Sequence, residues 1–252
     1  MEYVRLGKTN LLVSRVAFGA MRLKEGGSDE AALVVRKAYD AGVNFFDTSR
    51  KREGSEKLLG DALFDIRKNV FLSTTTSALN SNDIREELEQ SLLTLHTDFV
   101  DLYQFETEHF VPLPGYNDKV YDTLIKFKNE GKIRHIGICT QDYDTALKAV
   151  ESGAYETLQF PFSLVSPVKY SNLVKKCDEM DVGFIAMQPL GGGLLENIPL
   201  AFGFLNQFEN VIPLWGATKE DELNQILYFN EHPPVIDEKF KNDVEKLRNF
   251  FN

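Results

Sequence analysis

The chain has 252 residues, of which 43% are hydrophobic and 12% aromatic, and its formal net charge is −10. This apolar content is enough for a substantial core. The acidic balance argues against general nucleic-acid binding, because a phosphate backbone would be repelled. No apolar run reaches the roughly 18 residues of a membrane span. Two distant cysteines, Cys139 and Cys177, make no disulfide framework, which favours a reducing, cytoplasmic location. We therefore expect a cytoplasmic protein, and from its charge and apolar runs we expect neither nucleic-acid nor membrane partners.

The first element expected in chain order is a β-hairpin over about the first twelve residues, with Lys8-Thr9-Asn10 at its turn. Short apolar runs bounded by turn residues follow it, and such runs are typical of strands buried on both faces. Eight strands are expected: Val16–Gly19, Asn44–Asp47, Val70–Thr74, Asp101–Phe105, His135–Cys139, Thr157–Phe160, Gly183–Met187 and Val211–Leu214.

Helical patterns lie between these runs. Two are seen as apolar faces, around residues 31–38 and 84–95. Asn82 and Asp142 are expected as N-caps. Five further helices are expected: Val120–Asn129, Tyr143–Glu151, Ser171–Glu179, Lys219–Tyr228 and Asp237–Phe251.

Eight strands with intervening helices in about 250 residues predict a (β/α)₈ TIM barrel, with the N-terminal hairpin covering its floor. A doubly wound sheet is the alternative, but no Gly-rich fingerprint follows the first strand. The sequence has no low-complexity segment and no linker. We therefore expect a single domain over residues 1–252.

Segments along nearly the whole chain resemble the aldo-keto reductase family. They include RLGKTNLLVSRVAFGAMRL, GVNFFDTS, GSEKLLGDAL, DFVDLYQF, EGKIRHIGIC, TLQFPFSLV, VGFIAMQPLGGGLL and VIPLWGATKEDELNQIL. TLQFPF and IAMQPLGGG are most similar to a bacterial and archaeal branch whose members often carry a C-terminal iron–sulfur segment. No Cys cluster stands near Asn252, and the four His show no metal spacing. We expect neither an iron–sulfur cluster nor another metal.

The resemblance implies a catalytic set of Asp, Tyr, Lys and His at the ends of neighbouring strands, facing a nicotinamide. In that set the Tyr donates a proton, the Lys held by the Asp lowers the Tyr pKa, and the His orients the substrate carbonyl. Here Asp47 matches the Asp, but Arg52, Thr75 and Glu106 occupy the positions of the Tyr, Lys and His. A guanidinium cannot deliver a proton at neutral pH, so ordinary carbonyl reduction is expected to be very slow.

Two interpretations of this altered set stay open. In one, Arg52 forms an ion pair with Asp47 or Glu106 and the group has no catalytic role. In the other, Glu106 is a general acid or base, because two close carboxylates leave one protonated and one ionised near pH 7. The run Arg50-Lys51-Arg52 could bind an anionic substrate, although such a run is more often solvated.

The resemblance also implies NADPH or NADH as an extended cofactor without a Rossmann motif. Gln159 matches the residue that holds the carboxamide, and Met187 matches the residue beneath the nicotinamide ring. Cys139-Thr140 replaces a Ser-Asn pair, and Cys139 is a weak substitute. The loop Pro189-Leu190-Gly191-Gly192-Gly193 could approach a pyrophosphate through its N–H groups, or could be a plain tight turn.

The adenosine end of the expected cofactor site is altered. Gly216, Thr218 and Lys219 precede a helix whose N-terminus could meet a phosphate. By resemblance, Glu222 stands where a cation often holds the 2′-phosphate, and Ile226 replaces an Asn that contacts adenine. NADPH binding is therefore expected to be weakened, and NADH binding to be less affected.

Three hypotheses of function follow. The first is a nicotinamide-linked oxidoreductase of this family, acting on a small organic molecule with Glu106 in place of the Tyr. The second is a non-redox lyase or isomerase that uses Glu106 and Asp47 on an anionic substrate. The third is a non-catalytic protein that binds a ligand. The oxidoreductase is placed first because Gln159, Met187 and the glycine loop match the family's cofactor site. The fold alone would not establish a function.

Overall fold

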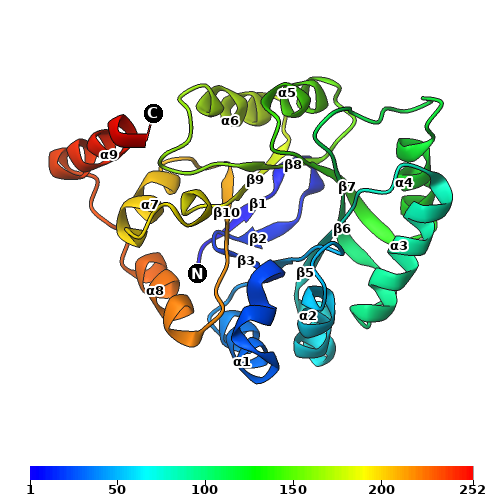
Figure 1. The fold of residues 1–252 in the computed structure, drawn as a ribbon, viewed down its shortest axis with the longest axis horizontal. Helices are drawn as coiled ribbons and strands as arrows, with labels where there is room; N and C mark the ends of the chain where they lie inside the picture. Colours follow the sequence, from blue (N-terminus) through cyan, green and yellow to red (C-terminus); the bar gives the residue numbers. More distant parts are fainter. Residues whose placement is uncertain (252) are drawn as a thin grey trace.

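A closed barrel of eight parallel strands forms the centre of the protein (Figure 1). The computed structural model describes residues 1–251. Neighbouring strands follow one another in chain order, and β10 closes the barrel against β3. The barrel strands are β3 (Ala17–Gly19), β4 (Phe45–Asp47), β5 (Phe71–Thr76), β6 (Val100–Glu106), β7 (Ile133–Cys139), β8 (Thr157–Pro161), β9 (Gly183–Met187) and β10 (Val211–Trp215). This confirms the predicted (β/α)₈ fold and excludes the doubly wound alternative.

Helices surround the barrel (Figure 1). They are α1 (Ser28–Asp40), α2 (Ser55–Leu63), α3 (Ser81–Thr94), α4 (Val120–Asn129), α5 (Tyr143–Glu151), α6 (Tyr170–Glu179), α7 (Ile198–Leu205), α8 (Glu220–Glu231) and α9 (Glu238–Phe251). Asp142 caps α5 as predicted, but α3 is capped by Asn80 instead of Asn82. The side chain of Asn80 accepts bonds from the N–H groups of Asn82 and Asp83, because Asn80 has extended backbone angles and Asn82 is already helical.

The N-terminal hairpin covers the barrel floor, the end at which the strands begin. Strand β1 (Tyr3–Arg5) pairs antiparallel with β2 (Leu12–Ser14). Between them, the N–H of Lys8 donates to the carbonyl of Asp181, and the Lys8 Nζ donates to the carbonyl of Gly153. Gly7 is required here, because its φ is +50° and a Cβ would lie 2.2 Å from the backbone N of Gly183. The prediction of a hairpin at the floor is confirmed.

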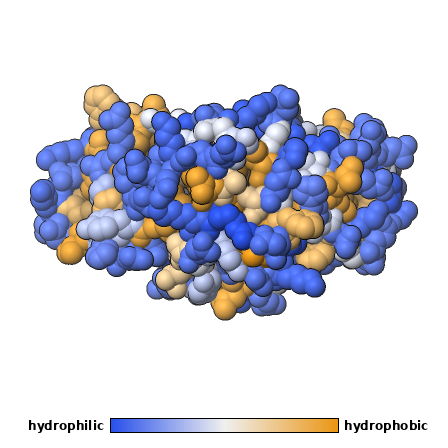
Figure 2. Space-filling view, turned by 90° about the horizontal axis from the view of Figure 1, so that it is seen from below, coloured by the Kyte–Doolittle hydropathy of each residue, from blue (hydrophilic) through white to orange (hydrophobic). Residues whose placement is uncertain are grey.

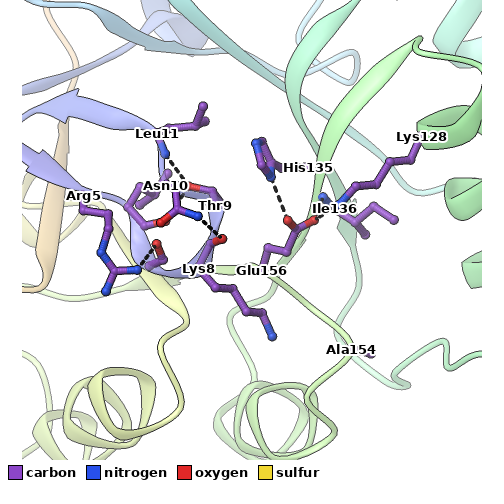
Figure 3. Close-up of polar contacts among 12 residues, drawn as sticks. Arg5, Lys8, Thr9, Asn10, Leu11, Lys128, His135, Ile136, Ala154 and Glu156 are labelled. Carbon is purple, nitrogen blue, oxygen red and sulfur yellow. Dashed lines mark hydrogen bonds and ion pairs between the residues drawn. The ribbon is translucent and has the colours of Figure 1, made fainter.

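A polar cluster lies beside this turn, between the starts of β7 and β8 (Figure 3). Glu156 accepts bonds from Lys128 Nζ at 2.7 Å and from the N–H of Ile136 at 2.9 Å, and its other oxygen lies 2.7 Å from His135 Nδ1. Burial by itself raises the pKa of Glu156, but these bonds outweigh it and lower the pKa to about 2. Glu156, just before β8, thus connects α4 and β7 at the floor of the barrel.

Apolar side chains fill two regions. One cluster lies inside the barrel near the floor and contains Leu6, Phe45, Leu102 and Ile185. The larger cluster packs the outer faces of the strands against the helices. This two-sided burial explains why the strands appear in the sequence as apolar runs.

Figure 2 shows the molecule from below the view of Figure 1. Hydrophilic residues cover most of this face, with apolar residues scattered among them. Among residues 1–251, no helix has the length and apolar character needed to span a bilayer.

Candidate active site

Three of the sequence-predicted catalytic residues lie near the mouth, the end of the barrel at which the strands finish. Asp47 ends β4, Thr75 is the second-to-last residue of β5, and Glu106 ends β6. The hydroxyl of Thr75 donates to Glu106 Oε2 at 3.4 Å, and the hydroxyls of Ser49 and Thr75 are 2.8 Å apart. The structure therefore brings Thr75 and Glu106 into direct contact, as their strand positions predict.

Asp47 lies deeper, in a polar layer inside the barrel. Gln104 Nε2 donates to its Oδ1 at 3.3 Å, and Gln159 Nε2 donates to its Oδ2 at 3.4 Å. Asp47 is fully buried and forms no ion pair within residues 1–251. Burial, assisted by the charge of Glu106, raises its pKa from 3.8 to about 7. The raised carboxyl pKa of the pair thus belongs to Asp47.

Arg52 does not pair with Asp47 or Glu106, which corrects the first interpretation of the altered set. Its side chain is exposed on the loop after β4, and it forms no ion pair within the described residues. Lys51 takes that place, with its Nζ 3.0 Å from Glu106 Oε1. The local turn explains the difference: the N–H of Arg52 donates to the carbonyl of Ser49, and the N–H of Lys51 donates to the Ser49 hydroxyl.

The third cation of the run points elsewhere. Arg50 NH1 lies 2.9 Å from Glu56 Oε2, and the other oxygen of Glu56 accepts a bond from Thr74. Glu56 is buried, so Arg50 neutralises a carboxylate behind the barrel wall. Of the cations in this run, only Lys51 contacts the predicted catalytic set.

The first part of the predicted cofactor site is largely bonded within the chain. Gln159 Oε1 accepts a bond from Gln104 at 2.7 Å while its Nε2 donates to Asp47, so its amide faces the barrel interior. The hydroxyl of Thr140 donates to Glu108 Oε2 at 3.3 Å. Burial, together with the neighbouring carboxylates, raises the pKa of the Cys139 thiol well above its usual value.

The glycine loop after β9 is a tight turn. The N–H of Gly191 donates to the carbonyl of Gln188, and the N–H of Gly193 donates to the carbonyl of Leu190. These two N–H groups are thus used inside the loop instead of facing a ligand. Met187, at the end of β9, is partly exposed, and Pro189 is buried.

At the start of α8, a carboxylate occupies the helix N-terminus. Glu222 Oε2 accepts bonds from the N–H of Thr218 at 2.7 Å and from its hydroxyl at 3.1 Å. Burial disfavours the charged form, but these bonds outweigh it and lower the pKa of Glu222. Gly216 and Lys219, by contrast, are exposed. The negative charge lies where an incoming phosphate would meet the helix.

Comparison with known proteins assigns the chain to a family. A sequence model described as the aldo/keto reductase family matches residues 15–200. The chain belongs to the aldo/keto reductase family. Within residues 1–251, no group of three or more His, Cys, Asp or Glu side chains is placed to hold a metal ion.

Two similar proteins are a dehydrogenase and a reductase by name. L-galactose dehydrogenase of Arabidopsis thaliana is 31% identical over 214 residues, which cover 77% of this chain and 67% of the relative. NADH-specific methylglyoxal reductase of Escherichia coli is 25% identical over 228 residues, covering 77% and 69%.

Two solved structures share the fold. Aldo-keto reductase AKR11C1 from Bacillus halodurans, in its holo form, superposes with a TM-score of 0.85 at 20% identity, over 98% of this chain and 96% of that one. An aldo-keto reductase from Klebsiella pneumoniae in complex with NADPH gives 0.84 at 19% identity, over 98% and 95%.

Sequence reasoning missed two residues of the candidate site. Gln104 was not singled out, although a polar residue in the middle of the apolar run DLYQF is a signal of an inward-facing hydrogen-bonding group. Lys51 was noticed only as part of a charged run. Nothing in three consecutive cations shows which of them faces the mouth.

Proposed function

We propose that the protein is a nicotinamide-linked oxidoreductase acting on a small organic molecule, with its acid–base chemistry at the mouth of the barrel, around Glu106. The observation that carries this proposal is the placement of Glu106 at the mouth, partly exposed and in contact with both Thr75 and Lys51. Family membership supports the reaction class, and the name of the methylglyoxal-reducing relative agrees with it.

Ordinary carbonyl reduction by the family's usual route is expected to be slow. Arg52 is exposed, and its guanidinium does not release a proton at neutral pH. Loss of a general acid typically costs about 10²–10⁴-fold in rate. We therefore expect the substrate to be one that exchanges its proton with the groups around Glu106 and not with a tyrosine phenol.

The residues present fit a nicotinamide dinucleotide in part. Met187 is partly exposed where the ring would lie, and Gly216 and Lys219 are exposed near the adenosine end. Gln104 Oε1 is a buried oxygen without a hydrogen-bond partner, so the amide layer that holds Gln159 keeps one unused acceptor. A bound cofactor would supply or accept hydride at this mouth.

NADH is the proposed cofactor in preference to NADPH. The carboxylate of Glu222 already accepts the N–H and hydroxyl of Thr218. A 2′-phosphate close to it would meet a like charge at a helix start that has been neutralised.

Two other functions remain candidates on specific observations. The internal bonding of Gln159 and of the glycine loop favours a non-redox lyase or isomerase that uses Glu106 and Asp47 on an anionic substrate. The same observations, with the exposure of Arg52, favour a non-catalytic ligand-binding protein.

Cofactor titration separates these candidates, and the protein carries its own probe. Trp215 is the chain's single tryptophan, is buried, and directly precedes Gly216. We expect NADH to quench its fluorescence by energy transfer at micromolar concentrations, and NADPH to bind more weakly. No binding of either cofactor at millimolar concentration, checked by calorimetry, contradicts the oxidoreductase proposal. Glu106→Gln should then abolish turnover without changing NADH affinity.

A further inference from the structure

The positive charge of the family's catalytic set has moved in this protein. Thr75 stands where the resemblance places a lysine, and Asp47 has no cationic partner within residues 1–251. An ammonium is nevertheless present at the mouth, beside Glu106. Lys51 Nζ lies 3.0 Å from Glu106 Oε1, while the other oxygen of Glu106 accepts a bond from Thr75.

This ion pair has a buried side and an open side. Glu106 is 27% exposed at its side chain, whereas Lys51 is 51% exposed. The hydroxyls of Thr75 and Ser49 extend the hydrogen-bonded chain on the buried side of the pair. Because half of the Lys51 side chain is exposed, a proton lost from its ammonium can be replaced directly from solvent.

We propose that the ammonium of Lys51 is the proton donor of this site, and that Glu106 is a positioning residue that holds it at the mouth. The inference rests on the proposed oxidoreductase function and names the group that completes it. In reduction, a bound NADH would lose a hydride from its dihydronicotinamide C–H bond and be oxidised to NAD⁺. That hydride would form the new C–H bond at the carbonyl carbon while the C=O π electrons move to oxygen. That oxygen takes a proton from Lys51, which becomes a neutral amine and is reprotonated by water.

The chemistry of an ammonium suits this role better than that of the neighbouring guanidinium. Ordinary lysine and tyrosine side chains have pKa values of about 10.4 and 10, so the two are acids of similar strength. A guanidinium is a far weaker acid, so Arg52 could not replace the phenol even if it turned inward. Glu106 accepts the ammonium of Lys51 in this pair and so holds it at the mouth.

The other titratable groups that face this pair are known. Asp47 and Cys139 lie close enough to feel the charge of Glu106, and Glu108 and Lys51 act on Cys139 as well. Cys139 stays a thiol, because burial and these carboxylates raise its pKa. With Lys51 as the donor, the rate should stay level through neutral pH and fall only as the ammonium deprotonates. A protonated carboxyl donor would instead lose activity as pH rises through the acidic and neutral range.

Two substitutions of Lys51 separate proton donation from charge pairing. Lys51→Arg keeps the ion pair with Glu106 but removes a usable proton, whereas Lys51→Met removes both. With NADH and methylglyoxal as the probe substrate, we expect both variants to lose about 10²–10⁴-fold in kcat at unchanged NADH affinity. Lys57→Met, on the exposed face of α2, is the matched control and should behave as the wild type.

A spectroscopic measurement makes the test independent of turnover. The titration of Lys51, followed by NMR of ¹³C-methylated lysines and assigned with Lys51→Arg, should shift when Glu106→Gln is introduced, whereas that of Lys57 should not. An active Lys51→Arg variant, or a Lys51 titration indifferent to Glu106, overturns the inference. So does a wild type that binds NADH but reduces no carbonyl. A wild type that binds neither cofactor overturns the proposed function itself.

Discussion

Arg67 and Asp101 form an ion pair that is almost wholly buried: NH2 of Arg67 lies 2.8 Å from Asp101 Oδ2, with the two side chains 10% and 1% exposed. The same carboxylate accepts the N–H of Leu72 and a bond from Arg134 NH1 at 2.9 Å. Both guanidinium groups also lie over the ring of Phe99. Asp101 thus joins β5, β6 and β7 on the outside of the barrel.

Replacing Asp101 should be strongly destabilising. Asp101→Asn keeps the side-chain size but leaves the buried guanidinium of Arg67 without a counter-charge, which costs about 3–5 kcal/mol. Urea denaturation measures the free energy of unfolding. Asp61→Asn is the control, because Asp61 pairs with Lys57 at the surface and should cost less than about 1 kcal/mol. Equal losses for the two variants would contradict the role given to Asp101.

Cofactor choice should respond to Glu222. Glu222→Gln retains an oxygen that can accept the bonds from Thr218 but removes the negative charge. NADPH should bind about fivefold more tightly, roughly 1 kcal/mol, with little change for NADH. Fluorescence titration of both cofactors gives the ratio. Glu231→Gln, at the far end of α8, is the control and should leave the ratio of the two affinities unchanged. An equal gain in NADH affinity in Glu222→Gln would show that Glu222 does not act on the 2′-phosphate.

Stability should depend on pH through Asp47. Because its pKa is raised from 3.8 to about 7, the folded protein keeps a proton that the unfolded chain releases between about pH 4 and pH 7. The free energy of unfolding should therefore fall as pH rises through this range, and the full cost of the buried charge, roughly 4 kcal/mol, is present above pH 7.

Asp47→Asn removes that dependence. The free energy of unfolding of the variant minus that of the wild type should therefore be larger at pH 8.5 than at pH 5. Urea denaturation at both pH values measures this difference. Glu156 acts in the opposite sense, since its pKa is lowered to about 2 and its contribution is lost only in acid. A variant-to-wild-type difference that is the same at both pH values would show that Asp47 does not titrate in this range.

The fold could be predicted because buried strands and helices have regular patterns of apolar residues in the sequence. The bounds predicted for β9, α4 and α5 agree with the structure, since each is an apolar run or face between turn residues. Helix α7 was missed because its sequence, IPLAFGFL, is apolar throughout and has no polar face to show helical periodicity. Only the strand order around it indicated that a helix was needed there.

The site was readable only in part. Strand ends placed Asp47, Thr75 and Glu106 correctly, because register fixes where a strand residue lies. Loop residues have no such constraint. With the backbone of Lys51 and Arg52 hydrogen-bonded to Ser49, the Lys51 side chain reaches Glu106, whereas that of Arg52 lies in solvent. Such bonds are a property of the folded loop and do not appear in residue order.

The docking of the N-terminal turn on the barrel floor has a consequence for the order of synthesis. Arg5 donates to Asp181, a residue 176 positions later in the chain. On the ribosome, β1 can pair with β2 early, but the contacts of the hairpin with Gly153 and Asp181 cannot form until most of the barrel has been translated. Closure of the floor is then one of the last events, and translation sets its timing as much as the local strength of the hairpin does.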